Sequence, residues 1–161
     1  MTHADLVVRA VSWLRGRHNC PVVFAEMATR VPMTMDALGF TRAGICHAVE
    51  CKRTRSDFHA DRKKVGHRCR GMMPGDLRWY LTPPALLRPD DLPDGWGLAE
   101  VHARRVVVVV EASRQDRSLT DRRVDVEILV SACHRHQIGV VWWAHNARFA
   151  PFAAVLRESP E

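Results

Sequence analysis

Long apolar runs are absent from this chain of 161 residues. No stretch approaches the roughly 18 uncharged apolar residues that a membrane span needs. The first residues mix charged and apolar side chains at helical spacing, unlike a secretory signal peptide. The five cysteines have no framework spacing and include no Cys-x-x-Cys pair, which fits reduced thiols better than a disulfide scaffold. We therefore expect a cytoplasmic protein with no membrane partner.

Several signatures of catalysis are also missing, because the sequence has no Gly-rich phosphate loop, no Gly-x-Ser-x-Gly elbow and no Ser/His/Asp pattern. Lysine is scarce, with three residues in a total of 24 Lys plus Arg. The net charge of +6 and the pI near 9.5 nevertheless favour an acidic partner such as nucleic acid. The length and the 47% apolar content predict one globular domain over 1–161, with a core at about 4–111 and a C-terminal helical part at about 116–161.

The apolar spacing predicts a mixed α/β or α+β fold around one central sheet. Residues 4–17 carry the stripe of an amphipathic helix, and Ser56 is expected to cap a second helix that ends near Gly66. Five consecutive valines at 106–110 are expected to form a buried strand, and a final helix is expected at 118–138. The order is αβββαβ followed by a β-hairpin and a C-terminal helix. The predicted strands before the hairpin, the first three of them a meander, are 21–28, 33–40, 44–52 and 77–84.

The segment 44–52 carries an unusual pair of charges. Because side chains alternate along a strand, Glu50 and Lys52 share one face and lie about 7 Å apart. In the preceding strand Asp36 stands among apolar residues, where a carboxylate is costly to bury unless it is paired or bound to a metal. If the two strands pair, Asp36 can stand beside Glu50. Two carboxylates suit Mg²⁺, and a neighbouring lysine would stabilise charge that develops on a phosphate.

These residues resemble the PD-(D/E)XK nuclease superfamily and, more narrowly, the MmcB-like DNA repair proteins of bacteria and phages. The Asp-x13-Glu-x-Lys spacing alone is a weak signal, and it gains weight from the basic helix and the loop that follow it. Met35 stands where the superfamily has its proline, a difference that removes no ligand. The resemblance covers roughly residues 20–110 and rests on DALGF (36–40), VECKRTRSDFHADRKK (49–64) and WYLTPPALLRPDDLPDGWGLAEV (79–101).

The resemblance implies a restriction-endonuclease-like core and hydrolysis of DNA phosphodiester bonds with Mg²⁺ or Mn²⁺, in DNA repair or phage DNA metabolism. It implies that Asp36 and Glu50 bind the metal, with the Cys51 carbonyl as a further ligand. Lys52 would position or polarise the attacking water, and Glu26 would be an additional catalytic acid. Because cutting a duplex needs two sites, a homodimer is also considered. The residues expected to contact the DNA backbone are Arg53, Arg55, Ser56, Arg62, Lys63 and Lys64.

Other interpretations of the same residues stay open at this point. The fold could be kept without turnover, as a DNA-binding or protein-interaction module. Glu50 and Lys52 could form a solvated pair, and Trp79-Tyr80 is expected to fill core more readily than to stack on bases. A zinc site is the weakest alternative, because its candidate ligands are far apart in the sequence: His67, Cys69, Cys133, His134 and His136.

Overall fold

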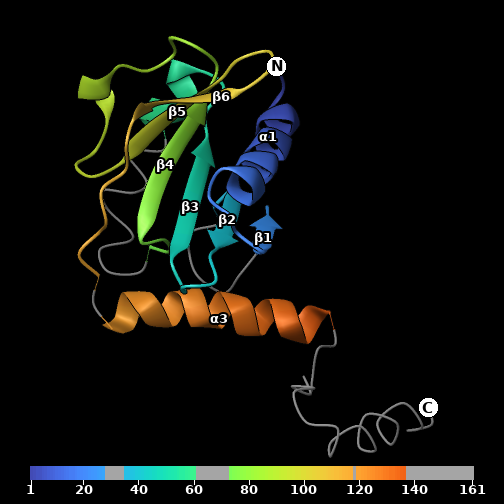
Figure 1. Ribbon diagram of the computed structural model, residues 1–161. Helices are drawn as coiled ribbons and strands as arrows, with labels where there is room; N and C mark the ends of the chain where they lie inside the picture. Colours follow the sequence, from blue (N-terminus) through green and yellow to red (C-terminus); the bar gives the residue numbers. More distant parts are fainter. Residues whose placement is uncertain (28–34, 61–72, 118, 137–161) are drawn as a thin grey trace, which may run out of the picture. The chain divides into compact units, whose positions relative to one another are not determined.

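The computed structural model describes residues 1–27, 35–60, 73–117 and 119–136 (Figure 1). The chain divides into two compact units, Met1–Ile128 and Leu129–Glu161, and the sheet and the candidate site belong to the first. The single domain expected over 1–161 stays a prediction. None of the helices in the described ranges is both long and apolar enough to cross a membrane.

The first helix, α1 (His3–Gly16), confirms the amphipathic helix predicted over 4–17. It begins with a reciprocal capping box. Thr2 Oγ1 accepts a hydrogen bond from the Asp5 N–H at 3.1 Å, and Asp5 Oδ2 accepts one from the Thr2 N–H at 2.6 Å. The helix lies against one face of the sheet (Figure 1). The side chains that it buries there are Leu6, Val7, Ala10, Trp13 and Leu14.

A six-stranded sheet in the order β1-β2-β3-β4-β5-β6 forms the centre of the fold. The first three strands make the predicted antiparallel meander, β4 joins β3 and β5 in parallel, and β6 closes the sheet as an antiparallel hairpin. The mixed α/β architecture predicted from the sequence is therefore confirmed. The strands are β1 (Val22–Ala25), β2 (Ala37–Phe40), β3 (Cys46–Cys51), β4 (Leu77–Thr82), β5 (Gly97–Val101) and β6 (Val106–Val110).

The main core lies between α1 and the sheet, where Trp79 of β4 packs edge-on against Trp13 with ring centroids 5.1 Å apart. Gly97 is required beside this ring, because a Cβ at that position would lie only 2.3 Å from Trp79. On the opposite face of the sheet, Tyr80 stacks on Trp96 at 4.5 Å and meets Phe58 at 5.1 Å. Trp79 and Tyr80 are each 1% exposed, which confirms that they fill core.

The helix after β3 begins earlier than the sequence predicted. Residues 55–60 are helical, and the Asp57 N–H donates to Thr54 Oγ1 at 3.1 Å. Thr54 therefore occupies the capping position, and the prediction that Ser56 caps this helix is wrong. Ser56 is exposed within the first turn. The predicted end of the helix near Gly66 lies outside the described residues.

The five valines of β6 form the predicted strand, but the prediction that this strand is buried is wrong. Every one of them is half-buried or exposed, and Val109 is 45% exposed. The reason is position, because among the described strands β6 is the last of the sheet and pairs only with β5. The final helix, α3 (Leu119–Arg135), agrees with the prediction for 118–138, whose last residues lie outside the described ranges.

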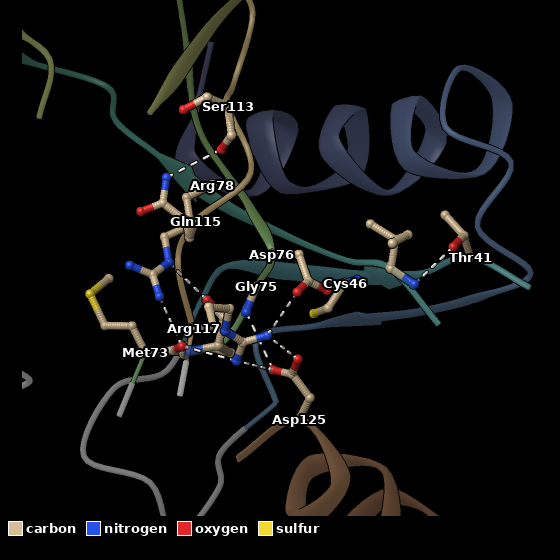
Figure 2. A network of polar contacts seen from close by, with 12 residues as sticks. Thr41, Cys46, Met73, Gly75, Asp76, Arg78, Ser113, Gln115, Arg117 and Asp125 are labelled. Atoms are coloured by element: carbon tan, nitrogen blue, oxygen red, sulfur yellow. Dashed lines mark hydrogen bonds and ion pairs between the residues drawn. The ribbon is translucent and has the colours of Figure 1, made fainter. Parts of the chain in front are cut away.

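A buried polar network ties the first turns of α3 to the sheet (Figure 2). Arg117, with 1% of its side chain exposed, donates two hydrogen bonds to the Asp125 carboxylate and lies 3.5 Å from Asp76. Asp76 Oδ2 also accepts the Cys46 N–H at 2.9 Å, and Asp125 Oδ1 accepts the Gly75 N–H at 3.3 Å. Neither Arg117 nor Asp125 was recognised from the sequence.

Candidate functional site

The end of β3 brings together the acidic residues that the sequence analysis selected. In the β2–β3 ladder Ala37 pairs with Val49, so the next position places Asp36 across from Glu50. Asp36 lies just before β2, and its Oδ2 accepts the Cys51 N–H at 2.6 Å. This hydrogen bond fixes the Asp36 carboxylate on the backbone of β3 beside Glu50.

Lys52 and Glu50 form a close ion pair at the same strand end. Their Nζ and Oε2 atoms are 2.8 Å apart, and the side chains are 10% and 7% exposed. Val49 and Cys51 pack in the core with α1, so alternation turns Glu50 and Lys52 to the other face of the sheet. The Lys52 N–H donates to the Leu81 carbonyl at 3.0 Å, which continues the parallel pairing with β4. A solvated pair, considered from the sequence, does not fit this burial.

The charges around Cys51 act on its thiol. Burial raises the pKa of Cys51, and the carboxylates of Asp36 and Glu50 raise it further, while Lys52 lowers it. The thiol therefore stays neutral at ordinary pH. The role expected for Cys51 was that of a backbone carbonyl ligand, and this part of the expectation stays a prediction.

His3 is a neighbour of this site that the sequence analysis missed. Its Nε2 lies 3.4 Å from Asp36 Oδ1 and 3.4 Å from Glu26 Oε1. The Glu26 N–H donates to the Asp36 carbonyl at 2.9 Å, and Glu26 has a left-handed backbone with φ of 47°. Its side chain is 63% exposed, so Glu26 is the most open of the selected acids. No local pattern could have identified His3, because its approach to Asp36 depends on how α1 docks.

The predicted DNA contacts fall into three groups. Arg53, which follows Lys52, and Ser56, on the following helix, are both exposed. Arg55 instead makes two hydrogen bonds to the Asp91 carboxylate at 2.9 and 3.0 Å and one to the Leu86 carbonyl at 3.1 Å. It thereby attaches the helix start to the short 3₁₀ helix η1 (Pro89–Asp91), and the hydrogen bond with Asp91 raises the pKa of Arg55. The other three, Arg62, Lys63 and Lys64, lie outside the described residues.

The chemistry of the donors suits a hard divalent cation. Within the described ranges no set of three His, Cys, Asp or Glu side chains is arranged to hold a metal ion. Mg²⁺ commonly takes only one or two protein carboxylates and completes its shell with water and substrate oxygens. Asp36 and Glu50 supply such oxygens, although each already has a protein partner. For the alternative zinc site, His67 and Cys69 lie outside the described residues and Cys133 is exposed.

Comparisons with known proteins extend the description of the fold. No family model matches the chain, and no curated protein matches it. A solved structure of a Silicibacter pomeroyi protein of unknown function is similar, with a TM-score of 0.61 and 22% sequence identity. The match covers 89% of this chain and 98% of the other. At this identity the similarity shows a shared fold and nothing about activity.

Proposed function

We propose that this protein is a metal-dependent nuclease that hydrolyses DNA phosphodiester bonds, in DNA repair or phage DNA metabolism. The observation that carries the proposal is the strand register, which sets Asp36 opposite Glu50 at the end of β3, where Lys52 pairs with Glu50. The succession of helix, three-stranded meander, helical segment and parallel strand supports a restriction-endonuclease-like core. The segments that carry the resemblance to the PD-(D/E)XK superfamily include these same three residues.

Each residue of the proposed site would have its own role in the reaction. The carboxylates of Asp36 and Glu50 would hold Mg²⁺ or Mn²⁺, with the Cys51 carbonyl as a further ligand. The ion would supply Lewis acidity, which lowers the pKa of a bound water and neutralises phosphate charge. Lys52 would share its charge between Glu50 and the phosphate, where it stabilises the negative charge that develops during attack. Glu26, beside Asp36, would be an additional acid at the exposed side of the site.

DNA would be held mainly through its phosphates. The net charge of +6 attracts the backbone without sequence preference, and the exposed Arg53 follows Lys52 directly. Such contacts release counterions, so binding should weaken steeply as salt rises. Arg55 is a weaker candidate for a phosphate contact, because Asp91 already neutralises it.

A second candidate function is a DNA-binding or protein-interaction module without turnover. The observation that favours it is that the carboxylates of Asp36 and Glu50 both have partners within the protein. The β3 backbone and His3 contact Asp36, and Lys52 contacts Glu50. Both carboxylates therefore have partners within the protein without a metal, as they would in a nuclease fold that has lost its activity.

The deciding experiment compares cleavage of single-stranded, duplex, flap and junction DNA by the full chain with Mg²⁺ or Mn²⁺. We expect cutting by the wild type, and a loss of at least about a hundredfold in the Asp36→Asn, Glu50→Gln and Lys52→Met variants. Asp94→Asn is the matched control, since Asp94 is an exposed acid that has no role in the proposed chemistry. Salt-sensitive, metal-independent binding without cutting of any substrate would reject the nuclease and support the module.

A further inference from the structure

The outer edge of β6 is unusual for a soluble domain. Among the described residues β6 pairs only with β5, so its other edge carries backbone donors and acceptors that no described strand uses. The strand consists of five valines, a residue with high strand propensity, and contains neither a proline nor a lysine. An exposed apolar edge of this kind is a template for pairing with another chain.

Opposite charges flank this edge. Arg105 precedes the valines and Glu111 follows them, and both side chains are exposed. Neither residue makes an ion pair with any residue in the described ranges. Both line the same hollow of about 410 Å³, together with Trp13 and Arg17 of the α1 end. One end of this edge therefore carries the positive charge of Arg105, and the other end carries the negative charge of Glu111.

We propose that β6 pairs antiparallel with β6 of a second copy of this chain, which joins the two sheets into one. In an antiparallel pairing about the middle of the strand, the Arg105 end of each copy lies beside the Glu111 end of the other. The segment is thus complementary to itself in charge as well as in backbone pattern. A parallel pairing would instead place Arg105 beside Arg105, so the charges select the antiparallel arrangement. The proposal does not rest on the nuclease assignment, because β4 and β5 separate β6 from β3.

The register of β6 also allows the opposite interpretation, in which the edge is protected from pairing. Experiment can distinguish the two. Leu98 pairs with Val110 and Ala99 with Val108, so Val109 is an extra residue in a bulge. Bulges twist edge strands and are one of the ways in which proteins prevent pairing. If the bulge and the charges protect the edge, the chain remains monomeric. If they define a register, it dimerises.

The test measures the mass of the full chain by sedimentation equilibrium over a wide concentration range. We expect a dimer whose dissociation constant rises by at least about tenfold in Arg105→Glu and in Glu111→Arg, because each change places like charges across from each other. An equimolar mixture of the two variants should recover the dimer, since every pair is then again of opposite sign. Arg104→Glu is the control for net charge, because Arg104 is an exposed neighbour outside the proposed charge pair.

Each outcome decides the proposal. A wild type that stays monomeric at all concentrations overturns it and assigns the bulge a protective role. A wild-type dimer that is unaffected by the charge reversals, or a mixture that fails to recover the dimer, overturns it in favour of an interface elsewhere. Circular dichroism of each variant checks that the fold is intact, which we expect because both altered side chains are exposed.

Discussion

The Lys52 ammonium lies 2.8 Å from the Glu50 carboxylate, and about nine-tenths of each side chain is buried. Two charges lose most of their hydration here, a cost that their attraction offsets only while both are present. The pair also links the two halves of the proposed chemistry, a metal ligand and a cation for the phosphate. Its disruption should therefore affect folding and cleavage in ways that can be separated.

Lys52→Met should lower the free energy of unfolding by about 3 kcal/mol, because it leaves the Glu50 carboxylate buried without its cation. Adding Glu50→Gln should return part of this loss, since the double variant buries no unpaired charge at this position. Urea denaturation of the wild type, both single variants and the double variant gives the coupling energy. Additive losses would show that the two side chains do not depend on each other.

The sequence could predict this pair because the information is local. Alternation along one strand places residues two apart on the same face, and Glu50 and Lys52 follow that rule. The pairing of Asp36 with β3 was also predictable, because short turns between apolar segments favour a meander. His3 could not be found in this way, since it reaches Asp36 only through the docking of α1.

Two of the errors have this same physical origin. The five valines indicate a strand but not its place in the sheet, so the edge position of β6 was not predictable from composition. Asp125 was not recognised from the sequence. Its burial makes sense only with Arg117, which lies before that helix and meets it in three dimensions. Interactions that require two elements to dock are those that sequence reasoning missed.

The correction at the helix after β3 leads to a simple test. Thr54→Ala should lower the free energy of unfolding by about 1 kcal/mol, because the Asp57 N–H then loses its capping acceptor. Ser56→Ala removes a hydroxyl from the same helix start and should change stability by less than about 0.5 kcal/mol, since Ser56 is exposed and does not cap. Chemical denaturation of the two variants side by side measures the difference. A larger loss for Ser56→Ala would restore the original prediction.

The network around Arg117 should contribute strongly to stability. Asp125→Ala removes two hydrogen bonds from a buried guanidinium and the acceptor of the Gly75 N–H, so we expect a loss of about 2–3 kcal/mol. Glu127→Ala is the matched control on the same helix, because its ion pair with Arg123 is exposed and worth about 0.3 kcal/mol. Thermal and urea unfolding of both variants measures the contrast. Similar losses would mean that the other partners of Arg117, which include Asp76 and the Met73 carbonyl, satisfy it without Asp125.

Two neighbouring imidazoles, the buried His47 and the half-buried His18, should make the fold sensitive to acid. The His18 and His47 rings lie 4.3 Å apart, and His18 also packs edge-on against Trp13 at 4.4 Å. Burial, helped by the charges of His47 and Arg17, lowers the pKa of His18 to about 4 from 6.5. Burial also lowers the pKa of His47, against the opposing effect of Asp76. Both rings are therefore neutral in the folded protein near pH 7.

The sign of the pH effect follows from proton uptake. Between pH 6.5 and about 4 the unfolded chain binds a proton at His18 that the folded protein does not, so the free energy of unfolding falls as the pH falls. Allowing for partial solvent screening, His18 should account for about 1–2 kcal/mol of the loss between about pH 7.5 and about pH 4.5. His18→Phe keeps an aromatic ring against Trp13 and should lose correspondingly less stability over the same interval. Urea denaturation at both pH values tests this, and an equal loss in the wild type and His18→Phe would show that His18 takes up its proton as readily when folded as when unfolded.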